Sequence, residues 1–149
     1  MRVVIAIDQS LNNSGVAVLN GKDIIHLTSI KSVKLRGMER LAHIETEFMK
    51  LIALYKPEKV ILENYAFGAR GRAVFNLGEL GGLIRMVLYR AGIPYEEVSP
   101  TTVKKKMSGS GKADKKAMVE AVNRYFNISI TDDNQADALA LGLIGQNLI

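Results

Sequence analysis

The stretch MRVVIAIDQSLNNSGVAVLNGKDIIHLTSI (residues 1–30) decides the fold class of this chain. Residues 2–7 form a mostly β-branched apolar run, which predicts a strand buried on both faces and ending at Asp8. Residues 15–19 resume an apolar strand after a turn-rich segment. Asn20-Gly21 then predicts a type I′ hairpin leading into a third strand over residues 23–30. The chain therefore opens with a three-stranded meander.

Beyond residue 30 the sequence alternates helices and strands. Apolar residues at helical spacing predict amphipathic helices, and short aliphatic runs predict further strands. The helices are expected over residues 37–54, 72–91, 113–126 and 133–148, with a short one after Ser99-Pro100, and the strands over residues 59–62 and 93–98. This order predicts an α/β fold with a central mixed five-stranded sheet, an antiparallel meander plus parallel strands, flanked by helices.

Composition narrows the class of protein. The 149 residues, 48% hydrophobic and 23% charged, suit a single domain over residues 1–149. The absence of cysteine excludes disulfides, thiolate zinc sites and a Cys nucleophile. Carboxylates, His26 and His43 are left as metal ligands, so Mg²⁺ or Mn²⁺ is the expected ion if a metal is bound. The absence of a signal segment or a run of about 18 apolar residues predicts a soluble cytoplasmic protein, with no membrane partner.

Two predicted buried strands end in an acid, at Asp8 and at Glu63. Each strand could simply end in water, but two such acids favour a shared divalent-metal site, because parallel neighbours release both at one sheet edge. The last predicted helix adds Asp132, Asp133 and Asp137. An N-cap explains Asp132 or Asp133, whereas Asp137 lies beyond the first turn, in a small and apolar run.

Basic residues gather in two segments. Residues 104–116 resemble a flexible linker suited to phosphate contacts, although a solubilising loop is an equal alternative. The second segment, Arg70 to Arg72, follows Tyr65 and Phe67, which could contact bases or belong to the core. The candidate nucleic-acid ligands are Tyr65, Phe67, Arg70, Arg72, Lys104, Lys105, Lys106, Lys112, Lys115 and Lys116. No phosphate-binding glycine motif follows a strand, so a P-loop or Rossmann site has no support.

Three motifs, IAIDQSLNNSG (5–15), VILENYAFG (60–68) and DNQADALALG (133–142), span almost the whole chain. In order and spacing they resemble the RuvC-type Holliday junction resolvases of the RNase H-like superfamily, and the short form looks like a phage-type member. The resemblance implies a homodimer that binds branched DNA, a four-way junction, and nicks two symmetric strands by Mg²⁺-dependent hydrolysis. Mn²⁺ is expected to substitute, with two ions in each active site.

The same resemblance assigns roles to residues. It implies that Asp8 bridges the metals, that Glu63 and Asp137 are further ligands and catalytic acids, and that Lys115 contributes to catalysis. The family usually has an acid or a His where this chain has Asn134. Asn134 could ligate through its amide oxygen, Asp133 could substitute for it, or the asparagine could be an inactivating change.

Other functions stay open from sequence. Actin-like ATPases and sugar kinases open with a similar hairpin, but they need two such domains. A non-cleaving junction-binding or regulatory module would not need the acids. A nuclease of the same fold could act on flaps, other branched DNA or RNA–DNA hybrids.

For the dimer, residues 78–88 are the expected interface, since their glycines permit close helix contact, unless those glycines serve packing on the sheet.

Overall fold

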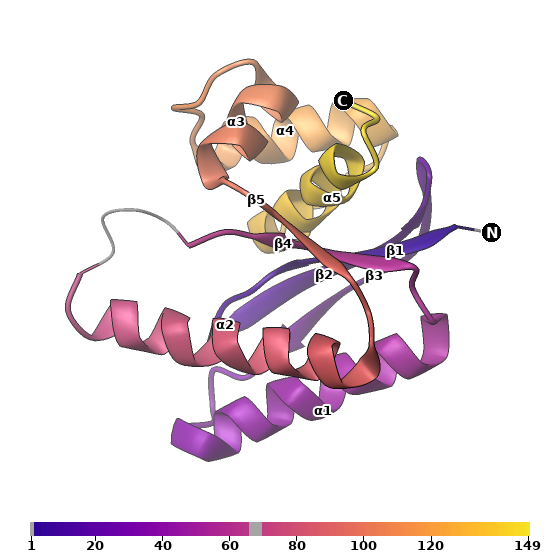
Figure 1. The fold of residues 1–149 in the computed structure, drawn as a ribbon. Helices are drawn as coiled ribbons and strands as arrows, with labels where there is room; N and C mark the ends of the chain where they lie inside the picture. Colours follow the sequence, from indigo (N-terminus) through magenta and orange to yellow (C-terminus); the bar gives the residue numbers. More distant parts are fainter. Residues whose placement is uncertain (1, 66–69) are drawn as a thin grey trace.

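The computed structural model describes residues 2–65 and 70–149 (Figure 1). The strands are β1 (Val3–Asp8), β2 (Asn13–Asn20), β3 (Asp23–Lys31), β4 (Lys59–Glu63) and β5 (Tyr95–Val98). The helices are α1 (Gly37–Tyr55), α2 (Arg72–Ala91), α3 (Pro100–Ser108), α4 (Lys115–Phe126) and α5 (Asp133–Gly145). Among the described residues, no helix combines the length and hydropathy needed to cross a membrane.

The five strands form one mixed sheet in the order β3-β2-β1-β4-β5. Strands β1, β2 and β3 pair antiparallel, as the predicted meander requires, while β4 pairs parallel with both β1 and β5. The predicted α/β architecture with a mixed five-stranded sheet is thus confirmed. The strands carrying Asp8 and Glu63 are parallel neighbours at the centre of that sheet.

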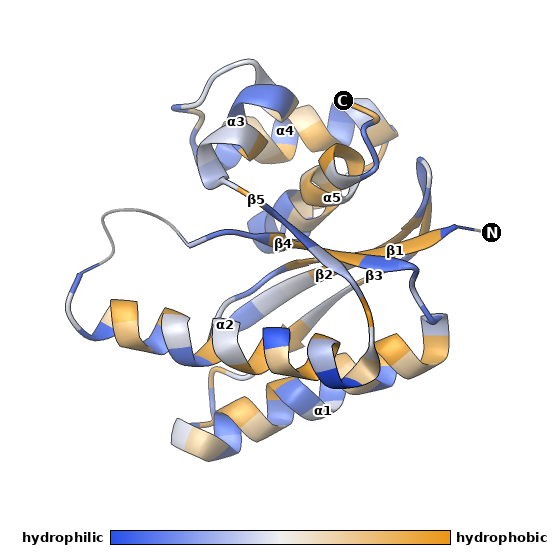
Figure 2. Cartoon of the chain, in the orientation of Figure 1, coloured by the Kyte–Doolittle hydropathy of each residue, from blue (hydrophilic) through white to orange (hydrophobic). Residues whose placement is uncertain are grey.

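Helices cover both faces of the sheet (Figure 1). On one face, α1 and α2 pack Phe48 and Ile84 against Ile5 and Ile7 of β1. On the other face, α5 lies against the sheet, with α3 and α4 outside it, and its buried residues contact Ala6. Figure 2 shows the apolar residues of β1 between these layers and the alternation of polar and apolar residues around α1 and α2. The alternate side chains of β1 therefore serve two separate cores.

Two local predictions are wrong. A type I′ turn needs a positive φ at both central residues, but of Gly21 and Lys22 only Gly21 has one (61°). The hairpin turn therefore has the φ pattern of type II′. The second error concerns the extent of the lysine linker, because Lys104 to Lys106 lie in α3, the short helix predicted after Ser99-Pro100. Only the connection between Ser108 and Lys115 is non-helical.

Candidate active site

Three carboxylates meet at the carboxyl edge of the sheet. Ile7 of β1 pairs with Leu62 of β4 in parallel register, so the next residues, Asp8 and Glu63, leave the sheet together. One carboxylate oxygen from each of Asp8, Glu63 and Asp137 lies within 4.8 Å of the other two. We call these three residues the acidic triad. The sequence-based expectation that these acids converge is confirmed.

The position of α5 brings Asp137 to the triad. Helix α5 begins at the N-cap Asp132, whose Oδ1 accepts hydrogen bonds from the backbone N–H groups of Asn134 and Gln135. The first turn of α5 lies directly on Gly15, the cross-strand partner of Asp8. A Cβ at Gly15 would lie 2.1 Å from the carbonyl oxygen of Asn134. Gly15 is therefore needed for this close approach.

Burial and mutual repulsion raise the pKa of all three acids. Desolvation, followed by repulsion from Glu63 and Asp137, holds the pKa of Asp8 well above its ordinary value. Burial and Asp137 raise the pKa of Glu63 to about 7. Burial and Asp133 raise the pKa of Asp137 to about 6. A cation placed among these groups would relieve their mutual repulsion.

The donor set of the triad suits a hard divalent cation. It offers carboxylate oxygens, the ligands that Mg²⁺ and Mn²⁺ prefer. Neither histidine joins it: His43 Nε2 lies 3.1 Å from the carbonyl oxygen of Lys31, and His26 stacks on Tyr55 with ring centroids 5.6 Å apart. Both histidines, possible metal ligands by residue type, therefore lie outside the triad and contact other parts of the chain.

The two candidates for a fourth ligand lie in different surroundings. Asp133 stands outside the triad, and its Oδ2 lies 3.7 Å from the Nζ of Lys115. Asn134 is half-buried, three residues before Asp137 and thus on the same side of α5. Its backbone carbonyl faces Gly15, beside Asp8. Asp133, four residues before Asp137, lies on that side as well, and its charge raises the pKa of Asp137. Both residues are therefore candidates for the additional oxygen donor.

Lysines share a cleft with the acids. Lys104 and Lys115 line a cleft of about 410 Å³ together with Glu63 and Asp137. Lys104 lowers the pKa of both acids, and Lys115 lowers that of Asp137, which partly offsets the effect of burial. The cleft therefore joins a cation-binding group to side chains that attract phosphate.

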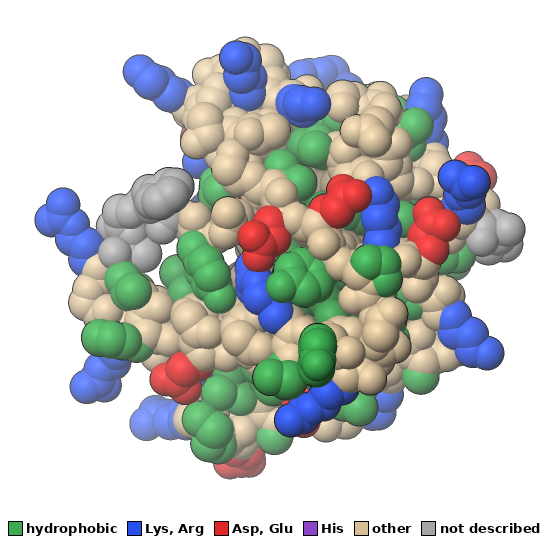
Figure 3. Space-filling model, in the orientation of Figure 1, with side chains coloured by type: hydrophobic (Ala, Val, Ile, Leu, Met, Phe, Trp, Pro, Cys, Tyr) green, Lys and Arg blue, Asp and Glu red, His purple; other side chains and the backbone are tan. Residues whose placement is uncertain are grey.

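The remaining basic candidates lie at the surface, on both sides of the sheet. Figure 3 shows Lys and Arg side chains gathered over α3 and the start of α4. All but Lys104 of the predicted basic ligands are exposed: Arg70, Arg72, Lys105, Lys106, Lys112, Lys115 and Lys116. They lie on the segment before α2, on α3 and α4, and on the connection between α3 and α4.

The structure describes one of the two candidate aromatic residues. Phe67 lies outside the described residues. Tyr65 is 39% exposed, and its ring packs against Gly81 and under Arg85, whose guanidinium carbon lies 4.9 Å from the ring centroid. Arg85 also donates to Glu97 at 2.6 and 2.8 Å. Sequence reasoning missed this anchor, although an arginine within an apolar helical run was a usable signal.

Comparison with known proteins agrees with this fold and site. A central mixed sheet with metal-ligating acids at adjacent strand ends and on the last helix defines a nuclease class, the metal-dependent enzymes of the RNase H-like superfamily. Residues 4–144 match the family of the crossover junction endodeoxyribonuclease RuvC. The chain belongs to that family, whose members are metal-dependent.

Individual relatives cover most of the chain. The crossover junction endodeoxyribonuclease RuvC of Thermotoga petrophila is 32% identical over 132 residues, which are 85% of this chain and 80% of the relative. The RuvC of Caldicellulosiruptor saccharolyticus is 28% identical over 94% of this chain and 89% of its own length. The Thermus thermophilus RuvC structure is 25% identical, with a TM-score of 0.78, over 95% of this chain and 91% of that one.

A second structure supports the fold alone. The T. thermophilus RuvC in complex with a Holliday junction substrate gives a TM-score of 0.83 at 24% identity. It covers 96% of this chain and 92% of that chain. The sheet and both helical layers of this chain are therefore shared with a junction-bound protein.

Proposed function

We propose that this chain is a Holliday junction resolvase that cuts four-way DNA junctions by metal-dependent phosphodiester hydrolysis. The observation that carries the proposal is the acidic triad, whose three carboxylates lie within 4.8 Å of one another. Two of its members, Glu63 and Asp137, line a cleft with Lys104 and Lys115. Membership of the RuvC family, and the junction substrate bound by the T. thermophilus protein, support the same substrate.

The triad, with Asn134 or Asp133 as a further ligand, would hold two Mg²⁺ ions, which Mn²⁺ could replace. Bound ions of this kind activate a water molecule and stabilise the leaving oxygen of the scissile phosphate. Lys115, on the outer side of the cleft, would contact the phosphate and oppose the charge that develops on it. Lys104 keeps Glu63 and Asp137 more readily ionised, and so ready to ligate.

The exposed basic residues would bind the DNA backbone without reading its sequence. Lys105, Lys106, Lys112 and Lys116 lie on or between α3 and α4, and Arg70 and Arg72 lie at the start of α2. Contacts of this kind set the register of DNA on a protein surface. Tyr65, held by α2 and still partly exposed, would contact a base near the branch point.

A homodimer would supply the two active sites that symmetric cutting needs. The outer face of α2 carries Phe75, Gly78, Gly82, Met86 and Tyr89 at helical spacing. Phe75 is 71% and Tyr89 80% exposed, and a Cβ at Gly78 or Gly82 would meet nothing within 4 Å. Gly81, in contrast, lies under Tyr65 and serves packing within the chain. Two copies of this face would allow close contact between helices.

Cleavage of matched synthetic substrates tests the proposal. A four-way junction, a three-way junction, a flap, a linear duplex and an RNA–DNA hybrid are incubated with Mg²⁺ and with Mn²⁺, beside Asp8→Asn. We expect symmetric nicks in the four-way junction and none with Asp8→Asn. Equal cleavage of duplex or hybrid would reject the resolvase function. Tight junction binding without cleavage by either metal would show a non-cleaving module instead.

A further inference from the structure

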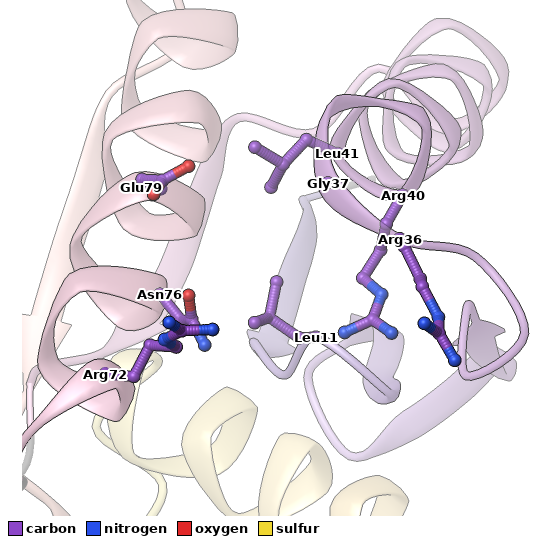
Figure 4. A pocket seen from close by; sticks show the side chains of 8 residues that line it. All are labelled: Leu11, Arg36, Gly37, Arg40, Leu41, Arg72, Asn76 and Glu79. Atoms are coloured by element: carbon purple, nitrogen blue, oxygen red, sulfur yellow. The ribbon is translucent and has the colours of Figure 1, made fainter.

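A second cleft opens at the same edge of the sheet, and arginines line it. It encloses about 290 Å³ between the start of α1, the start of α2 and the loop after β1. Arg36 and Arg40 enter it from the α1 side, and Arg72 and Asn76 from α2 (Figure 4). We call these four residues the arginine cleft.

The cleft has the charge of an anion site. Within the described residues, no carboxylate lies within ion-pair distance of Arg36, Arg40 or Arg72. Arg40 is held in place, since its Nε donates to the carbonyl oxygen of Leu35 at 2.6 Å. Glu79 is the one acid among the lining residues, and Figure 4 shows it on the α2 wall, about a turn or more beyond Arg72 and Asn76 and across the cleft from Leu41. The guanidinium end is therefore strongly positive.

The backbone adds to the positive electrostatic potential of the cleft. Helices α1 and α2 both begin at the cleft, and neither N-terminus is capped by a side chain. The positive ends of the two helix dipoles therefore lie at the cleft, although Glu39 in the first turn of α1 offsets part of the charge of that helix end. The planar guanidinium groups and the Asn76 amide supply the donors that a phosphate accepts.

The strands and helices that lead to the cleft indicate which anion it binds. Leu11, in its floor, follows Asp8 by three residues, and Arg72 opens the helix that follows Glu63. The two central strands thus lead to the acidic triad and to the arginine cleft at one sheet edge. No aromatic ring lines the cleft among the described residues, so it has no platform for a base.

We propose that the arginine cleft binds the phosphodiester backbone of a DNA arm whose scissile strand lies in the acidic triad. This inference rests on the proposed nuclease function and extends it to a binding site on the α1–α2 side of the sheet. The cleft would contact phosphate only, so it fixes the direction of the arm without reading sequence.

Salt-dependent binding tests the inference. Arg36→Gln/Arg40→Gln is compared with Arg2→Gln/Arg90→Gln, which removes two exposed arginines before β1 and at the end of α2, away from the cleft. All proteins carry Asp8→Asn to prevent cleavage. Fluorescence anisotropy with a labelled four-way junction and a labelled linear duplex gives Kd over a range of KCl concentrations.

We expect the cleft variant to bind both DNAs roughly tenfold to a hundredfold more weakly, and the slope of log Kd against log salt to fall by about 1.8. The control should stay within about threefold, with a smaller change in slope. Unchanged affinity and slope in the cleft variant, or equal changes in both variants, would overturn the inference.

Two further measurements complete the test. Arg36→Lys/Arg40→Lys keeps the charge and should retain most of the salt slope, which separates lost contacts from misfolding of the Gln variant. Stabilisation by inorganic phosphate that depends on Arg36 and Arg40, without any effect on DNA binding, would overturn the assignment to DNA. Failure of the parent protein to cut junctions would reject the proposed function, whereas the slope on linear duplex reports on the cleft alone.

Discussion

Asp8 shows most clearly the cost of building this site. Its side chain is 9% exposed at the end of a central strand, among acids that raise its pKa. An ionised carboxylate in such a place destabilises a fold unless a cation accompanies it. The residues that make the site chemically useful are therefore those that lower the stability of the metal-free protein.

A pH-dependent stability follows. Folding raises the pKa of Glu63 from 4.5 to about 7 and that of Asp137 from 3.8 to about 6, so between these values the folded state binds more protons than the unfolded chain. The contribution of these groups to the free energy of unfolding should therefore fall as pH rises through this window, on the order of 3 kcal/mol for Glu63 alone. Melting in EDTA at several pH values measures it.

Divalent metal should restore the stability that the metal-free protein loses as pH rises. We expect Mg²⁺ to raise the melting temperature at pH 8 far more than at pH 5, because protonated acids do not bind it. Asp8→Asn should melt at or above the parent protein in EDTA at pH 8 and gain nothing from Mg²⁺. Equal melting of the parent in EDTA and in Mg²⁺ at pH 8 would argue against the metal site.

At the level of elements, the site depends on the contact between α5 and β2. Gly15 meets the first turn of α5, and further along that helix a Cβ at Gly142 would lie 2.2 Å from Leu19 Cδ1. These small residues let a deeply buried helix lie close to the sheet. That closeness holds Asp137 beside two acids that belong to strands.

Gly15→Ala tests this contact. Its methyl group would overlap the carbonyl of Asn134, so α5 must shift, and overpacking of this kind costs about 1–3 kcal/mol. We expect a lower melting temperature in EDTA and also a smaller Mg²⁺ stabilisation, because Asp137 and Asn134 move with the helix. A lower melting temperature with a full Mg²⁺ response would show that the first turn of α5 does not set the metal geometry.

In the whole molecule, charge of opposite sign is divided along one sheet edge. The acidic triad lies between the sheet and α5, and the arginine cleft lies on the side of α1 and α2. The formal net charge of +5 does not reveal this division. A cation site flanked by phosphate-binding surfaces suits a nuclease that must hold a bulky branched substrate.

We propose that the outer face of α2 forms the dimer interface. Gly82→Glu would place a charge at the centre of the proposed interface, where a small residue now leaves open space. We expect the parent chain to sediment as a dimer of the 16.3 kDa subunit and the variant as a monomer. The variant should nick a junction without coordinated paired cuts. A monomeric parent at micromolar concentration would contradict the proposal.

Part of the fold and of the candidate site could be predicted from local sequence patterns. The strand ending at Asp8, the strand ending at Glu63 and the helix 72–91 follow from hydrophobic periodicity and short-range signals. The hairpin type was wrong because the turn depends on the φ of Lys22, which residue identity does not determine. The sequence predicts the short helix after Ser99-Pro100 but not how far it continues into the lysines, because the lysine and glycine content of residues 104–116 also fits a linker.

The sequence by itself determined the order of elements and the chemistry of the acids, because both depend on residue type and spacing along the chain. Only the tertiary structure decided which groups meet. The requirement for Gly15, the anchoring of Tyr65 by Arg85 and the placement of Arg36 and Arg72 on the two walls of one cleft join residues far apart in sequence. Such contacts depend on how helices lie on the sheet, and packing sets that arrangement through the whole core.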